Sequence, residues 1–248
     1  MTKAEGRGLA ALPQAVRERL EEWTKALEGA LGGDLVGIVV HGSVARGEYR
    51  PKESDVDAVV VVKEPSFAKL EAIANAMQVA RYAARIEAMI LTEEEISGAA
   101  DAFPLLYDEI KQCNVVVAGK DPFADVVIHD THRRLRIEQE LREAQIRLRR
   151  AVTDAQGARE AVGGAVARKV KQIRGPLHAL LAMKGKSCGA GLDEVVAEAG
   201  KTWGVDIAPL RRAREAPGEA HAALVALLSK AVDDVNRMPD GLAPGGAA

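Results

Sequence analysis

The most constraining feature of the chain is the stretch LVGIVVHGSVARGEYRPKESDVDAVVVV, residues 35–62. Two apolar runs in it, Leu35–Val40 and Ala58–Val62, have the length and β-branched composition of buried strands. The first run ends in His-Gly-Ser, and Asp55 and Asp57 precede the second. Alternate residues of a strand point to the same side, so the two aspartates are predicted to project from one face. The stretch therefore predicts strand, tight turn, short helix, loop and strand.

Neighbouring carboxylates on one face repel each other, by about 4 kcal/mol at about 4 Å and an effective dielectric of 20. A divalent cation removes this cost, and Mg²⁺ takes one or two protein carboxylates and completes its shell with phosphate and water. Gly42 lets a phosphate approach the backbone, and Ser43 is placed where free helical N–H groups favour anions. The residues alone leave a second interpretation open, a turn followed by a strand with a solvated acidic end.

Gly42, Ser43, Asp55 and Asp57 together resemble the motif of the polymerase-β-type nucleotidyltransferase superfamily. The resemblance implies an enzyme that binds a nucleoside triphosphate and two Mg²⁺ ions and transfers a nucleotidyl group, usually to a hydroxyl. It also implies a third carboxylate on a later strand, for which Glu87 is the candidate. Glu87 would be a metal ligand, a general base or both, whereas an isolated strand glutamate otherwise belongs to a solvent-facing surface.

The site predicted in this way has two overlapping sets of residues. The catalytic and metal-binding set is Asp55, Asp57 and Glu87. The nucleotide-binding set is Gly42, Ser43, Ser54, Lys171 and Arg174, of which the last two come from a basic helical segment in the second half of the chain. The implied cofactors are two Mg²⁺ ions, with the nucleoside triphosphate as co-substrate.

The predicted fold class is α+β, a small mixed β-sheet with flanking helices followed by an all-α bundle. The expected domains are a nucleotidyltransferase domain over 1–124, a helical bundle domain over 125–238 and a disordered tail over 239–248. The segment DPFADVVIHD, residues 121–130, is interpreted as a linker, because beyond it apolar residues repeat at helical spacing. Gly175-Pro176 is expected to kink the second helix of the bundle.

This two-part layout resembles the aminoglycoside nucleotidyltransferases, such as the kanamycin and streptomycin adenylyltransferases, and its helical half resembles HEPN-type domains. The resemblance implies ATP as donor and a hydroxyl of a small, aminoglycoside-like acceptor, for which acidic residues would line the cleft; the candidates are Asp101, Asp108 and Glu109. Some HEPN domains are ribonucleases in which four to six residues separate an Arg from a His. Arg174 and His178 are separated by three, which argues against that activity. Two alternatives remain open, a protein adenylyltransferase and a nucleotide-binding regulatory or antitoxin-like module without turnover.

The composition also bears on which partners and which cellular location are expected. Aromatic residues make up 3% of the chain and the formal net charge is −2, which argues against a nucleic-acid partner. The two cysteines lack metal-type spacing, the N-terminus lacks a signal-peptide pattern, and no apolar run approaches the roughly 18 residues of a membrane span. We therefore expect a cytoplasmic monomer or homodimer whose partners are a nucleoside triphosphate and a small-molecule or protein acceptor.

Overall fold

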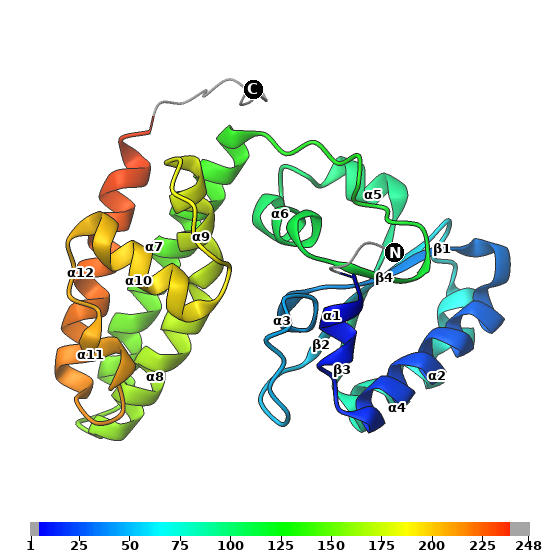
Figure 1. The fold of residues 1–248 in the computed structure, drawn as a ribbon, viewed down its shortest axis with the longest axis horizontal. Helices are drawn as coiled ribbons and strands as arrows, with labels where there is room; N and C mark the ends of the chain where they lie inside the picture. The colour runs from blue at the N-terminus through cyan, green and yellow to red at the C-terminus, as the bar shows by residue number, and fades with distance from the viewer. Residues whose placement is uncertain (1–4, 239–248) are drawn as a thin grey trace. The chain divides into compact units, whose positions relative to one another are not determined.

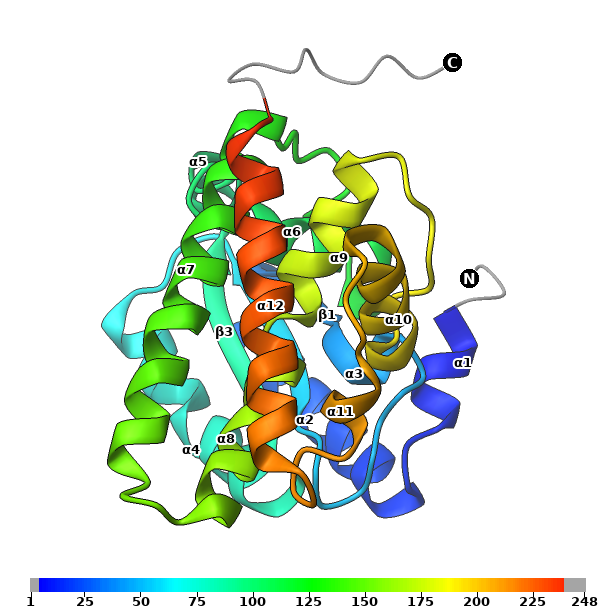
Figure 2. The same cartoon turned by 90° about the vertical axis from the view of Figure 1, so that its left-hand side faces the viewer.

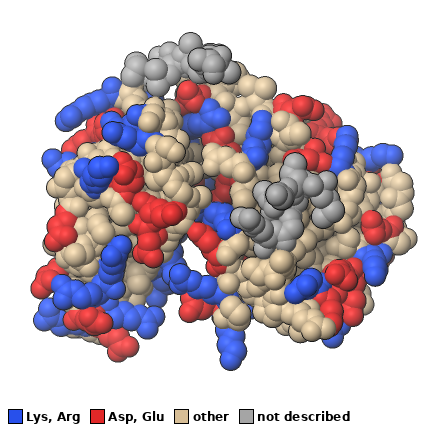
Figure 3. All heavy atoms as spheres, in the orientation of Figure 1, with Lys and Arg blue, Asp and Glu red and all other residues tan. Residues whose placement is uncertain are grey.

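The computed structural model describes residues 5–238, which divide into two compact units between Ile128 and His129 (Figures 1 and 2). The first unit contains a mixed sheet with helices, and the second is helical, which confirms the predicted α+β class. Figure 3 shows acidic and basic side chains interspersed over one face of the molecule. The predicted tail, residues 239–248, lies outside the described residues.

A four-stranded sheet with the order β3-β2-β1-β4 forms the centre of the first unit. β1 pairs antiparallel with both β2 and β4, and β2 pairs in parallel with β3. The central strands β1 and β2 are buried on both faces along most of their length, and apart from Gly37 and Asp57 their residues are all aliphatic. The strands are β1 Leu35–Val40, β2 Val56–Val62, β3 Ile86–Thr92 and β4 Val115–Gly119.

Helices cover both faces of this sheet. α2 and α4 pack on the face that carries Ile38 and Val60. α5 and α6 pack on the opposite face, which carries Val59 and Val61. The helices of this unit are α1 Glu5–Ala10, α2 Gln14–Leu31, the 3₁₀ turn Gly32–Asp34, α3 Gly42–Ala45, α4 Phe67–Ala84, α5 Glu93–Gly98 and α6 Pro104–Gln112.

Arg85 sets the register of the parallel pair β2 and β3. It adopts a left-handed conformation with φ of 53° and ends α4, because its N–H bonds back to carbonyls of the last helical turn. Its own carbonyl then accepts a hydrogen bond from Val56 N at 2.9 Å, which starts the ladder at the next residue. Asp57 and Glu87 become direct partners across the two strands.

The segment interpreted as a linker is instead packed into the first unit. Phe123 is fully buried and makes an edge contact with Tyr107 at 5.2 Å between ring centroids, and Val126 and Ile128 are buried in the same cluster. Asp121 accepts a hydrogen bond from Phe123 N at 2.9 Å and another from the Asn114 side chain at 3.1 Å. The alternating apolar residues of this loop cover the sheet face beside α5 and α6.

The second unit is a helical bundle in which α12 packs against α7 and α8, and α9 packs against α7 and α10. The second predicted helix is interrupted at Ile173, three residues before Pro176, whose ring nitrogen cannot donate to the carbonyl of the preceding turn. Among residues 5–238, none of the helices is both long and apolar enough to cross a bilayer. The helices are α7 Asp130–Asp154, α8 Arg159–Gln172, α9 Arg174–Met183, α10 Leu192–Trp203, α11 Ala208–Arg211 and α12 Pro217–Asn236.

Candidate active site

The turn after β1 brings the backbone of Gly42 against the carboxylate of Asp57. His41 N donates to Asp57 O at 2.9 Å, so the strand pairing continues to the edge of the turn. Gly42 has φ of +68°, and a Cβ at this residue would lie 2.4 Å from Asp57 Oδ2. Only glycine fits here, because any side chain would collide with the carboxylate and strain the backbone. Ser43 follows in α3 and is half-buried.

Asp57 and Glu87 project from the same edge of the same sheet face. They are paired residues of the parallel strands β2 and β3, and neighbouring strands lie about 4.8 Å apart. Asp55 immediately precedes β2 and has the same side-chain direction as Asp57. Its Oδ1 accepts a hydrogen bond from Arg85 Nε at 2.7 Å, and Glu87 Oε1 accepts one from Arg81 Nε at 3.1 Å.

The pKa of Asp57 is raised from 3.8 to about 6. Burial is the largest cause, followed by the charges of Asp55, Glu109 and Glu87, while Arg46 opposes them. Within the described residues, no side chain donates a hydrogen bond to the Asp57 carboxylate. The Asp57 carboxylate therefore lies among other negative charges, and no side chain donates a hydrogen bond that would stabilise its ionised form.

Arg46 and Glu109 complete the polar cluster. The Arg46 side chain is 12% exposed, pairs with Glu48 at 3.0 Å and also pairs with Glu109, which α6 brings from 63 residues away. His41 is buried beside them, and that burial lowers its pKa. The sequence interpretation named Glu109 only as an acceptor contact and missed Arg46. The feature that could have identified Arg46 was a charged residue in the otherwise mostly buried turn after β1.

The other predicted nucleotide-binding residues have separate surroundings. Ser54 Oγ accepts a hydrogen bond from Arg50 N at 3.1 Å and closes the loop before Asp55. Lys171 and Arg174 lie in the second unit, where Arg174 Nη1 donates to Ala190 O at 3.0 Å. Their role toward the nucleotide stays a prediction. So does the acceptor role of Asp101, in the turn after α5, and of Asp108, in α6.

The donor set suits a hard cation, although its side chains are not gathered around one point. Among residues 5–238, no group of three His, Cys, Asp or Glu side chains is arranged to hold a metal ion. The donors at the edge are carboxylate oxygens, the ligands that Mg²⁺ prefers. Asp55 and Glu87 are engaged by arginines on the surface. Exposed ion pairs of this kind contribute about 0–1 kcal/mol, so a cation can displace them.

The sequence pattern of the family described as nucleotidyltransferase domain matches residues 20–145, slightly more than half of the chain. The chain belongs to this family. The match confirms the superfamily and enzyme class predicted from the Gly-Ser and Asp-x-Asp motifs. One similar solved structure is the crystal structure of spectinomycin adenyltransferase AAD(9) from Enterococcus faecialis with ATP and spectinomycin. Its TM-score to this nucleotidyltransferase is 0.48 and the sequence identity is 15%. The similarity covers 86% of this chain and 98% of that chain. Among curated protein sequences, no significant match is found.

Proposed function

We propose that this nucleotidyltransferase is Mg²⁺-dependent and transfers a nucleoside monophosphate from ATP to a hydroxyl of a small, cationic acceptor. The observation that carries the proposal is the juxtaposition of three residues, Gly42, Asp57 and Glu87. Asp57 and Glu87 are paired across β2 and β3, and the Asp57 carboxylate lies directly against the Gly42 backbone. The proposed metal-binding edge and the proposed phosphate-binding turn would thus form one site.

Asp55, Asp57 and Glu87 would hold the metal ions. The raised pKa of Asp57 supports this, because clustered carboxylates in a partly buried site gain most from a nearby cation. When bound, Mg²⁺ neutralises the triphosphate and stabilises the in-line displacement at the α-phosphorus. Arg85 and Arg81 would release Asp55 and Glu87 to the metal and remain as cations at the rim of the site.

The turn after β1 would bind the β- and γ-phosphates. Gly42 itself is buried against Asp57, and the Ser43 hydroxyl follows at a half-buried position from which it would reach a phosphate. Arg46, which lowers the pKa of Asp57 and of His41, adds a guanidinium suited to bidentate phosphate binding. To bind phosphate, Arg46 would share or exchange its carboxylate partners Glu48 and Glu109.

Glu87 would serve as general base. The acceptor hydroxyl oxygen forms a bond to the α-phosphorus, the bond to the bridging oxygen breaks, and pyrophosphate leaves. The hydroxyl proton passes to the Glu87 carboxylate, which must lie about 2.6–3.2 Å from it or act through a water. The surplus of carboxylates, Asp55, Glu87 and Glu109 around Asp57, supports a cationic acceptor.

The test is incubation with each of the four nucleoside triphosphates, Mg²⁺ and a panel of aminoglycosides, followed by mass spectrometry. The expected result is acceptor carrying one added nucleoside monophosphate, with equal release of pyrophosphate. Glu87→Gln should lower turnover by about 10²–10⁴-fold, the usual contribution of a general base. Glu94→Gln, on the exposed surface of α5, is the matched control and should behave as wild type. Labelling of protein instead of small molecules would contradict the proposed acceptor.

A further inference from the structure

One side chain, that of Arg85, holds the loop that carries Asp55. Loop 50–55 lies between α3 and β2, and most of its residues are exposed. Arg85 Nε donates to Asp55 Oδ1 at 2.7 Å, and Arg85 Nη1 donates to Lys52 O at 2.6 Å. The Arg85 carbonyl also accepts a hydrogen bond from Val56 N at 2.9 Å. Arg85 therefore binds the chain on both sides of Asp55 as well as Asp55 itself.

The backbone is strained at both ends of the hydrogen bond between Arg85 and Lys52. Among residues 5–238, positive φ angles outside glycine occur at Lys52 with 70°, Arg85 with 53° and Gln156 with 47°. A side chain in this region costs free energy that glycine avoids. The residue that ends a helix in this conformation is usually glycine. Arginine at this position therefore indicates that its side chain is needed, and its side-chain hydrogen bonds go to loop 50–55.

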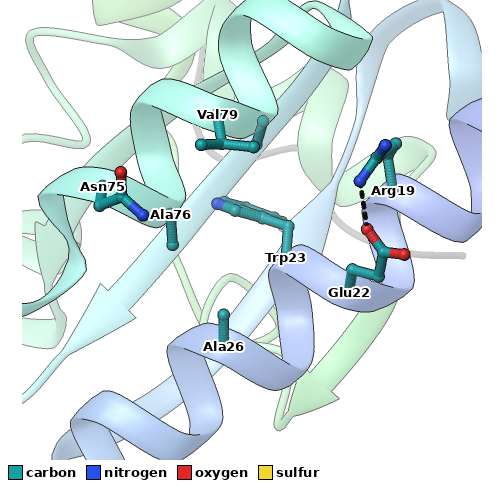
Figure 4. A pocket seen from close by; sticks show the side chains of 8 residues that line it. Arg19, Glu22, Trp23, Ala26, Asn75, Ala76 and Val79 are labelled. Atoms are coloured by element: carbon teal, nitrogen blue, oxygen red, sulfur yellow. Dashed lines mark hydrogen bonds and ion pairs between the residues drawn. The ribbon is translucent and has the colours of Figure 1, made fainter.

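Arg85 is attached to a well-packed part of the first unit. It ends α4, which packs along α2 on one face of the sheet. Val79 of α4 lies over the ring of the buried Trp23 of α2 (Figure 4). The next residue after Arg85 is Ile86, which is buried and starts β3. The Arg85 side chain thus joins an exposed loop to a helix and a strand of the core.

Asp55 needs such a contact when no metal is bound. Asp55 and Asp57 project to the same side of the chain, so their like charges repel each other. Asp57 is fixed inside β2 by the pairing with β3, whereas Asp55 precedes the strand. The repulsion would therefore turn the exposed loop, and Asp55 with it, away from the site. Asp55 and Arg85 are 41% and 47% exposed, so their pair adds little to global stability and its effect is local.

We propose that Arg85 is a positioning residue of the nucleotidyl-transfer site, which holds loop 50–55 so that Asp55 stays on the side of Asp57 before metal and nucleotide bind. The proposal rests on the function proposed above. When a cation binds, Asp55 Oδ1 exchanges Arg85 Nε for it. The hydrogen bond from Arg85 Nη1 to Lys52 O does not involve the carboxylate, so it keeps the loop in place during the exchange. Less binding free energy is then spent on ordering the loop.

Hydrogen–deuterium exchange of the metal-free full chain tests this role. The reporters are the amides of Glu53 and Ser54, which donate to Arg50 O at 3.1 and 2.9 Å and close the loop. Arg85→Gly should speed their exchange by about tenfold or more, because the loop opens more often. The melting temperature should stay the same or rise, since glycine relieves the left-handed strain. If Arg85 served only to end α4, glycine would leave the exchange of the loop unchanged.

Arg81→Gln is the matched control for charge. Arg81 pairs at 3.1 Å with Glu87, which the strand pairing of β3 already holds in place. Arg81→Gln and Arg85→Gln each remove one positive charge from the same edge. Arg85→Gln should speed the exchange of the two loop amides, whereas Arg81→Gln should leave it as in wild type. In calorimetry, Arg85→Gln should weaken binding of Mg²⁺·ATP by about tenfold more than Arg81→Gln does, because the loop must then be ordered on binding.

Three results would overturn the proposal: unchanged exchange in both Arg85 variants, equally fast exchange in Arg81→Gln, or equal affinity of Arg85→Gln and Arg81→Gln for Mg²⁺·ATP. Failure of the function proposed above is distinguishable, because the exchange is measured without metal or nucleotide. A wild type that does not bind Mg²⁺·ATP, with exchange still faster in Arg85→Gly, would overturn that function and leave Arg85 as a loop contact alone.

Discussion

Replacing Asp57 by asparagine should stabilise the protein in the absence of metal and nucleotide. The pKa of Asp57 rises from 3.8 to about 6 in the folded chain, chiefly through burial and the charge of Asp55. Each pKa unit is equivalent to about 1.4 kcal/mol, so ionised Asp57 lowers the free energy of unfolding by at most about 3 kcal/mol. Because the carboxylate is not fully buried, a gain of about 1–3 kcal/mol is expected for Asp57→Asn at pH 7.5.

The stability gained by Asp57→Asn relative to wild type should increase with pH. Well below pH 3.8 Asp57 is protonated in both folded and unfolded chains, so the substitution should change nothing there. As pH rises from 4 to 6 the unfolded chain loses the proton first, and the stability of wild type falls relative to the variant. Above about pH 6 the difference should be constant.

Urea unfolding between pH 4 and pH 8 measures this effect. The chain has two tryptophans, so a Trp203→Phe background leaves Trp23 as the fluorescent reporter of the first unit. Asp125→Asn, an exposed aspartate of the same unit, is the matched control and should follow wild type within about 0.5 kcal/mol. Parallel stability curves for wild type and Asp57→Asn, or a less stable variant at pH 7.5, would refute the reasoning.

The remaining predictions concern the turn, the buried histidine and the loop before the second unit. Gly42→Ala should lower the free energy of unfolding by about 1–3 kcal/mol and abolish transfer, because the new Cβ collides with Asp57 and the left-handed backbone is strained. Gly47→Ala is the control for strain alone, because Gly47 has φ of +73° and open space around it. Equal losses of stability in the two variants would disprove the collision. Burial lowers the pKa of His41, so on acidification below pH 6.5 the unfolded chain takes up the proton first and wild type loses stability. His41→Asn should reduce this loss. Urea unfolding at pH 5 and pH 7 measures the loss, and the same loss in wild type and variant would contradict the prediction. Phe123→Ala should cost about 3–5 kcal/mol in urea unfolding, whereas a change below 1 kcal/mol would show that the loop is a free linker.

The strands and the two carboxylates of the motif could be predicted because their signals are local. Continuous runs of Val and Ile mark buried strands, and each of the Gly-Ser and Asp-x-Asp pairs consists of residues one or two positions apart. The pairing of Glu87 with Asp57 depends on Arg85, whose left-handed conformation is not encoded by a glycine. The sequence therefore predicted a third carboxylate by resemblance and could not predict its register.

Tertiary packing decided the features that were missed. Arg46 and Glu109 are 63 residues apart and meet because α6 packs over the sheet, an arrangement with no local signature. The loop 121–128 contains proline and aspartates, which indicate a linker, yet its apolar residues complete a core cluster. Ile173, rather than Gly175, marks the helix break, because the missing N–H of Pro176 acts on the preceding turn.

The most direct test of the central claim is calorimetric titration of ATP into the protein with Mg²⁺ and, separately, with EDTA. The proposed site predicts binding that requires Mg²⁺, because the triphosphate otherwise meets the carboxylates Asp55, Asp57 and Glu87 unscreened. Asp57→Asn should weaken binding by at least about tenfold, or 1.4 kcal/mol, whereas Glu94→Gln should leave it unchanged. Equal affinity in EDTA, or full affinity in Asp57→Asn, would contradict the assignment of this sheet edge as the nucleotidyltransferase site.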